Sequence, residues 1–174
     1  VGSTALAFLN HATATDGFNV AVGNSAGYAV TTGTKNILIG GETGDALTDA
    51  DFNTAVGDAA LSSDTLGSRS VAVGQGALFS QNFTTATDVF NTAVGMHAGL
   101  SITTGIRNTL IGGNAGDALT DADFNAAVGV GALGADTLGS RSVAVGQQAL
   151  GLQNFTTATD TYNIGIGYTP GNAM

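Results

Sequence analysis

Apolar and polar residues along the chain follow a five-residue pattern that occurs nine times. Each copy begins with Asn or Ser, continues with three mostly apolar residues and ends with Gly, as in Asn-Thr-Ala-Val-Gly at residues 53–57. Side chains alternate along a strand, so the second and fourth residues face one side and the third faces the other. We therefore predict one short strand per copy and a turn at the glycine, which tolerates a positive φ. The fourth position is always β-branched: Val22, Ile39, Val56, Val73, Val94, Ile111, Val128, Val145 and Ile166.

Both faces of these predicted strands are largely apolar, which is typical of strands buried on both sides, as in parallel sheets. Two arrangements are consistent with this pattern. In one, a trimer buries one strand face between chains. In the other, a single narrow solenoid turns its alanines outward. Both remain expectations at this point.

The copies recur with a 17-residue period, and every fourth interval is lengthened to 21. This gives a 72-residue super-repeat: residues 19–90 and 91–162 are identical at 51 of 72 positions, residues 1–18 are a partial super-repeat, and residues 163–174 are a last partial coil. A 17-residue unit is too short for a strand plus a helix, and no apolar stripe of helical period persists. We predict one all-β domain over residues 1–174, a parallel β-solenoid or β-roll of about ten coils that is homo-oligomeric. At about 4.8 Å per coil, the rod would be roughly 48 Å long.

Stacking of equivalent residues predicts two side-chain columns. The first is a structural ladder of amides, interrupted by Ser70 and Ser142, in which neighbouring coils exchange hydrogen bonds. The second is a stripe in which aromatic and basic residues alternate, with each cation one coil from a ring and within reach of a cation–π contact. A glycan-binding role for this stripe is the alternative. The ladder comprises Asn19, Asn36, Asn53, Asn91, Asn108, Asn125 and Asn163, and the stripe comprises Phe18, Lys35, Phe52, Arg69, Phe90, Arg107, Phe124, Arg141 and Tyr162.

The four extra residues of the long coils fall in residues 81–88 and 153–160, with 10–16 as a diverged copy. Insertions in solenoids emerge as loops on one face, often a binding face. They are the candidate partner loops, although a spacer or a clasp between chains fits equally well. The candidate residues are Asn82, Phe83, Thr84, Thr85, Asn154, Phe155, Thr156 and Thr157.

Acidic residues cluster in residues 44–52 and in the copy at 116–124. With Asp64 one coil later, they offer oxygen ligands of the kind that Ca²⁺ takes. The spacing matches neither an EF-hand nor the nonapeptide of calcium β-rolls, so we interpret them as solvated turn carboxylates, with calcium as the alternative cofactor. The residues concerned are Asp45, Asp49, Asp51, Asp117, Asp121 and Asp123.

Composition narrows the function further. Thirteen acidic against four basic residues give a net charge of −9, which argues against nucleic acid as a partner, and no apolar run is long enough to insert into a membrane. The absence of Cys excludes thiol chemistry. Almost every candidate catalytic group recurs in the other super-repeat, and His11 and His97, which do not, have no acidic companion. We expect no enzymatic activity.

The residues also resemble known repeats. Residues 19–35 and 91–107 resemble the short repeats of phage tail-fibre-like and large bacterial surface proteins, which often end in an endosialidase-type chaperone domain. The Ser-Val-Ala-Val-Gly at residues 70–74 and 142–146 is similar to the head repeats of trimeric autotransporter adhesins. The resemblance implies a parallel β-solenoid or β-roll, usually a homotrimer, displayed outside a cell or on a virion. The repeat units of adhesin heads are shorter than those of this chain, and the printed sequence includes neither a chaperone domain nor a membrane anchor.

We therefore expect a stiff segment of an extracellular fibre or filament, on a cell surface or virion, that displays loops at fixed intervals. A glycan- or receptor-binding module that uses the loops at 81–88 and 153–160 is the alternative. The chain has no signal peptide and does not begin with Met, so we expect a processed chain or part of a longer one. Subunits either stack end to end into a filament or form part of a longer trimeric fibre.

Overall fold

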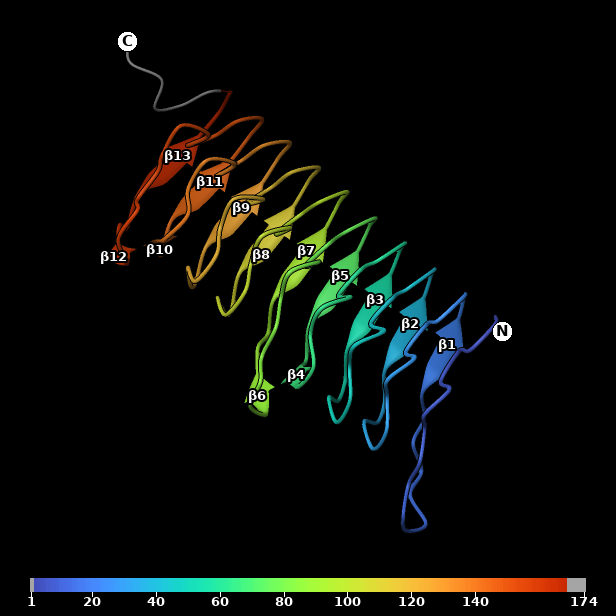
Figure 1. Ribbon diagram of the computed structural model, residues 1–174. Coiled ribbons are helices and arrows are strands. Elements are labelled where there is room, and N and C mark those ends of the chain that lie inside the picture. The colour runs from blue at the N-terminus through green and yellow to red at the C-terminus, as the bar shows by residue number, and fades with distance from the viewer. Residues whose placement is uncertain (1, 169–174) are drawn as a thin grey trace.

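The computed structural model describes residues 2–168, and its main feature is a stack of coils with one strand from each (Figure 1). Nine three-residue strands form a single sheet in the order of the chain, and every neighbouring pair is parallel and in register. This confirms the parallel β-solenoid. The strands are β1 (Val20–Val22), β2 (Ile37–Ile39), β3 (Thr54–Val56), β5 (Val71–Val73), β7 (Thr92–Val94), β8 (Thr109–Ile111), β9 (Ala126–Val128), β11 (Val143–Val145) and β13 (Ile164–Ile166).

The two long coils, residues 70–90 and 142–162, each add a short strand next to the coil before them. β4 (Gly67–Ser68) pairs with β6 (Thr87–Asp88), and β10 (Gly139–Ser140) pairs with β12 (Thr159–Asp160). We call these two the inserted coils and the 17-residue units the regular coils. The partial unit before β1 contributes turns but no strand among the described residues, and residues 169–174 of the predicted last coil lie outside them.

The core is a narrow column of small and medium side chains whose sizes compensate from coil to coil. The third strand residue points inward and is buried, as at Leu38 and Ala55. Where this residue is Leu, a glycine follows six residues later, and a Cβ on Gly44 would lie 2.8 Å from a Leu38 methyl group. Where it is Ala, the later position is a leucine in four coils, as at Ala55 and the buried Leu61. In the coils of Ala21 and Ala93 both positions are small, and a Cβ on Gly99 would lie 2.9 Å from the Leu78 and Leu110 side chains of the neighbouring coils. Leucines of the same or an adjacent coil therefore fill the interior.

The second and fourth strand residues point outward and are mostly exposed or half-buried. The prediction that both strand faces are buried is therefore wrong for the single chain, and so is the arrangement with alanines outward. The narrow interior has room for only one strand face, and the alanines and leucines of the third position fill it.

The glycine after each strand is required by both its conformation and its surroundings. At Gly112, φ is +132°, and an added Cβ would lie 2.6 Å from the carbonyl group of Gly129 in the next coil. A side chain is strained at this φ, and here it would also strike the neighbouring backbone. The recurring glycine thus sets the coil-to-coil approach at this corner.

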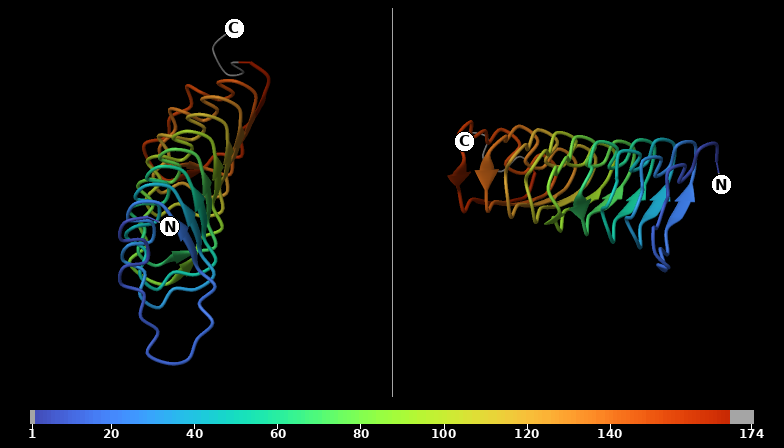
Figure 2. Two further views of the ribbon diagram at one scale, coloured as in Figure 1. Left: turned by 90° about the vertical axis from the view of Figure 1, so that its right-hand side faces the viewer. Right: turned by 60° about the horizontal axis from the view of Figure 1, so that its bottom comes forward.

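The rod has distinct sides (Figures 1 and 2). The long loop of residues 10–16 and the turns that carry β6 and β12 project from the same edge, opposite the corner where the strands end. Within residues 2–168 no helix is long and apolar enough to cross a membrane.

Candidate functional site

The outward side of the nine-stranded sheet is an extended apolar surface along the rod. In-register pairing aligns the fourth strand residues into one row of Val and Ile that is unbroken from β1 to β13. The second strand residues form a parallel row of Val, Ile, Thr and Ala, and neither row contains an acidic residue. Exposed fractions near the middle of the fourth-position row are 37% for Val94 and 41% for Ile111. We call these two rows the outward sheet face.

The aromatic–basic stripe is present as an alternating column. The Lys35 ammonium lies 4.7 Å from the centre of the Phe52 ring, and the Arg69 guanidinium lies 4.6 Å from the same centre. Phe124 is likewise approached by Arg107 at 5.4 Å and Arg141 at 4.6 Å. These rings already have cations near them on both neighbouring coils, which leaves less of each ring face for stacking on a sugar. The contacts favour the structural role of the stripe.

Every stripe residue also has a left-handed backbone, with φ between 49° and 66°. This conformation is costly for residues with a side chain, about 1–2 kcal/mol each. The stripe therefore marks a tight corner just before each strand, and stacking of its side chains partly offsets the backbone strain.

The asparagine ladder exists, and its bonds mostly join side chains to backbone. Asn53 Nδ2 donates to the Gly67 carbonyl in its own coil at 2.9 Å, and its Oδ1 accepts the amide of Ser70 in the next coil at 2.9 Å. Direct amide-to-amide bonds occur from Asn36 to Asn19 at 3.2 Å and from Asn108 to Asn91 at 3.3 Å. The amides from Asn19 to Asn125 thus each close their own coil and fix the register of the next one, whereas Asn163 Nδ2 donates to Gln153 of the coil before.

The inserted coils replace this arrangement with a buried polar cluster. Asp64 is fully buried and accepts bonds from the Gly67 and Phe83 amides, both at 3.0 Å, and from Gln81 Nε2 at 2.6 Å. Gln81 also donates to Ser70 Oγ at 3.1 Å and accepts from Asn91 Nδ2 at 2.9 Å. The same cluster recurs around Asp136 and Gln153.

Asp64 is therefore not a solvated carboxylate, and it does not belong with the acidic cluster of residues 44–52. Its column is apolar in the regular coils that do not precede an inserted coil, with Val30, Leu47, Ile102 and Leu119. Comparison of that column along the sequence would have identified Asp64 as an inward residue.

Only some of the candidate loop residues are exposed. Asn82, Thr84 and Thr85 are exposed, whereas Phe83 is buried with 7% of its surface accessible. In the second copy Asn154, Thr156 and Thr157 are exposed and Phe155 is half-buried. The phenylalanines anchor the loops to the rod, and the display surface consists of Asn and Thr side chains.

The candidate calcium residues lie in two coils, residues 36–52 and residues 108–124, and most of them accept bonds from an adjacent coil. Asp45 accepts from Ser62 at 2.7 Å, Asp49 from Thr32 at 2.5 Å and Asp51 from Thr34 at 2.9 Å. Within residues 2–168 no three His, Cys, Asp or Glu side chains are placed to hold one metal ion. In the second copy Asp117 accepts from Asn114, Asp121 from Thr104 and Asp123 from the amide of Ile106.

A threonine column was missed by the sequence analysis. The hydroxyl groups of residues at the same coil position donate to carbonyls of the next coil, as from Thr48 to Thr65 at 3.1 Å and from Thr120 to Thr137 at 3.1 Å. The signal was Thr at the 17-residue spacing: Thr31, Thr48 and Thr65, then Thr103, Thr120 and Thr137.

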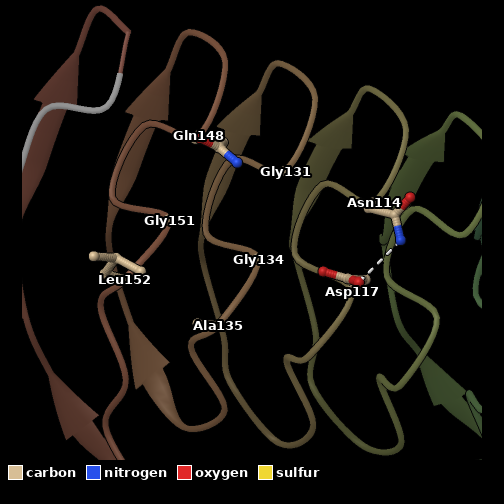
Figure 3. Close-up of a pocket in the computed structure, with 8 residues that line it drawn as sticks. All are labelled: Asn114, Asp117, Gly131, Gly134, Ala135, Gln148, Gly151 and Leu152. Atoms are coloured by element: carbon tan, nitrogen blue, oxygen red, sulfur yellow. Dashed lines mark hydrogen bonds between the residues drawn. The ribbon is translucent and has the colours of Figure 1, made fainter. Parts of the chain in front are cut away.

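A pocket of about 300 Å³ spans three coils of the second super-repeat (Figure 3). Its middle coil offers only small residues, Gly131, Gly134 and Ala135, while polar side chains stand on the flanking coils. Asn114 donates to Asp117 Oδ2 across 3.0 Å on one side. The complete lining is Asn114, Asp117, Gly131, Gly134, Ala135, Gln148, Gly151 and Leu152.

Comparison with known proteins finds no matching family model, no similar curated protein and no similar solved structure.

Proposed function

We propose that this chain is a stiff segment of an extracellular fibre, on a cell surface or virion, in which three copies associate through their outward sheet faces. The observation that carries the proposal is the unbroken Val and Ile row on the outward side of nine strands. The trimer and the location follow the resemblance of the repeats to adhesin heads and phage fibres.

The size of the outward sheet face supports association. Eight interstrand spacings of about 4.8 Å make it about 38 Å long, and three residues at about 3.3 Å make it about 10 Å wide. Its area of about 400 Å² is in the range where a contiguous apolar patch marks an interaction site. Burial of this area stabilises association at roughly 25 cal/mol per Å².

The charge distribution favours a second copy of this chain as the molecule that packs on the outward sheet face. The chain carries a net charge of −9, so two copies repel each other wherever their carboxylates meet. The outward sheet face has no acidic residue in either row, and all four cations lie in the adjacent stripe. This side of the rod is therefore where copies approach at the lowest electrostatic cost.

The geometry also suits a shaft. Strand pairing and backbone bonds around each coil, such as Gly44 N to Ala60 O at 2.9 Å, continue from one coil to the next. Each coil contacts its neighbours and adds a fixed rise, so the rod is stiff along its axis. The exposed Asn and Thr of the inserted coils recur every four coils, about 19 Å apart.

Cysteine cross-linking tests the proposal, because the chain has no Cys of its own. We would place one Cys in β7, at the middle of the outward sheet face, in the separate variants Thr92→Cys and Val94→Cys. Equivalent residues of parallel copies meet near the axis, so mild oxidation should give disulfide-linked pairs from at least one variant. Thr85→Cys, on an exposed loop, is the matched control and should give no linked pairs. Absence of linked pairs from both β7 variants would contradict the proposal.

A further inference from the structure

The pocket of Figure 3 differs from its counterpart in the first super-repeat far more than the rest of the rod does. Seven of its eight lining residues are changed 72 positions earlier, although the super-repeats agree at 51 of 72 positions. Only Asp117 is kept, as Asp45. The counterparts of Asn114, Gly131, Gly134, Ala135, Gln148, Gly151 and Leu152 are Glu42, Ala59, Ser62, Ser63, Gly76, Phe79 and Ser80.

The first super-repeat carries larger side chains at several of these positions. The Ser62 hydroxyl donates to Asp45 Oδ1 across 2.7 Å, and Phe79 is the counterpart of Gly151 in the second copy. In the second copy Gly134 supplies no hydroxyl. An added Cβ on Gly134 would lie 3.3 Å from Asp117 Oδ1, which places that oxygen beside the vacated space.

We propose that the pocket binds one neutral hexopyranose unit of a glycan. A sugar hydroxyl takes the place of the Ser62 hydroxyl and donates to Asp117 Oδ1. The apolar face of the sugar ring takes the place of the Phe79 ring, against Leu152 and Ala135. The Gln148 carboxamide, on the opposite flanking coil, offers both a donor and an acceptor to the remaining hydroxyls.

Charge and size limit the class of ligand. The Asp117 carboxylate and the net charge of −9 disfavour sialic and uronic acids. A volume of about 300 Å³ is at the lower end of ligand sites, enough for one ring and not for a long chain. The lining residues follow the strands in each coil, so binding here does not rest on association through the outward sheet face.

Saturation-transfer NMR tests the proposal with methyl glycosides of glucose, galactose, mannose and N-acetylglucosamine as probes. We expect saturation of at least one of them, with a Kd of about 1 mM for a shallow site. Asp117→Asn should weaken binding about tenfold, and Asp45→Asn, in an identical nine-residue context, should leave it unchanged. Gly151→Phe restores the residue of the first super-repeat and should abolish saturation. Leu100→Phe is the control and should not abolish it, because Leu100 lies outside the lining and its counterpart in the first super-repeat is the aromatic Tyr28.

Circular dichroism confirms the fold of each variant before binding is compared. No saturation of any of the four glycosides would overturn the proposal. An equal loss in Asp117→Asn and Asp45→Asn, or full binding by Gly151→Phe, would overturn it as well.

Discussion

In a regular coil the polar group inside the rod is the amide of an asparagine at the first position of the unit. In an inserted coil it is the amide of Gln81 or Gln153, eleven residues further on. In the inserted coils a serine, Ser70 or Ser142, stands at the position of that asparagine. Serine has a shorter side chain than asparagine. Gln81 Nε2 donates both to the Ser70 hydroxyl and to Asp64 of the preceding coil. An insertion in this rod therefore goes with concerted changes at three inward positions, because an unpaired polar group in a narrow core would cost free energy.

The largest expected effect on stability comes from removing the Asp64 carboxylate, which lies where a regular coil meets an inserted coil. Asp64→Ala leaves two buried backbone donors without an acceptor, the amides of Gly67 and Phe83, and removes one of the two hydrogen bonds that Gln81 Nε2 donates. Each unsatisfied donor costs about 1–3 kcal/mol, so we expect a loss of about 3 kcal/mol or more in the free energy of unfolding. Urea denaturation measures it.

Asp58→Ala is the control for this change. Asp58 is exposed, and its removal should shift stability by no more than about 0.5 kcal/mol. Equal effects of the two substitutions would show that the buried cluster does not hold the insertion in place.

An exchange of residues between the two kinds of coil should cost stability in both directions. Asn108→Ser removes the bond to the Ala122 carbonyl, at 2.8 Å, and the regular coil has no glutamine to replace it. Ser70→Asn places a longer side chain where Gln81 already lies. We expect about 1–3 kcal/mol from each in thermal or urea unfolding. A neutral result for either change would mean that the residue at this position does not depend on the insertion.

The smallest expected effect concerns the surface stripe. Arg69 packs on two rings and pairs with Asp88, which the insertion supplies, at 2.8 Å. Arg107 lies over Phe124, and no ion pair to it is found within residues 2–168. Because these groups are largely exposed, Arg69→Gln should cost about 1 kcal/mol and Arg107→Gln about 0.5 kcal/mol.

Salt separates the two contributions to that difference. In 1 M NaCl the extra cost of Arg69→Gln should shrink, because screening weakens an exposed ion pair. A difference between the two variants that is unchanged by salt would argue against the Arg69–Asp88 pair as its origin.

The repeat period was enough to predict the solenoid and its strands, because stacked coils place equivalent residues in columns. It was not enough to decide which strand face points inward, so it placed neither Leu38 inside nor Val94 and Ile111 outside. A strand with apolar residues on both faces has the same pattern whether its second face meets its own chain or another. The role of Asp64 was missed because it was grouped with nearby acidic residues rather than with the apolar column to which it belongs. The pocket was missed because it arises from small residues, whose effect appears only when three coils are stacked.

The native mass of the chain tests the central claim most directly, measured by sedimentation velocity across a range of concentrations with negative-stain imaging of particle shape. Burial of the outward sheet face between three copies predicts a discrete species with three times the 17.0 kDa mass of one chain and the form of a short rod. A monomer of 17.0 kDa at every concentration would contradict the claim. Filaments one rod in width would contradict it too, because they would place the association at the ends of the rod.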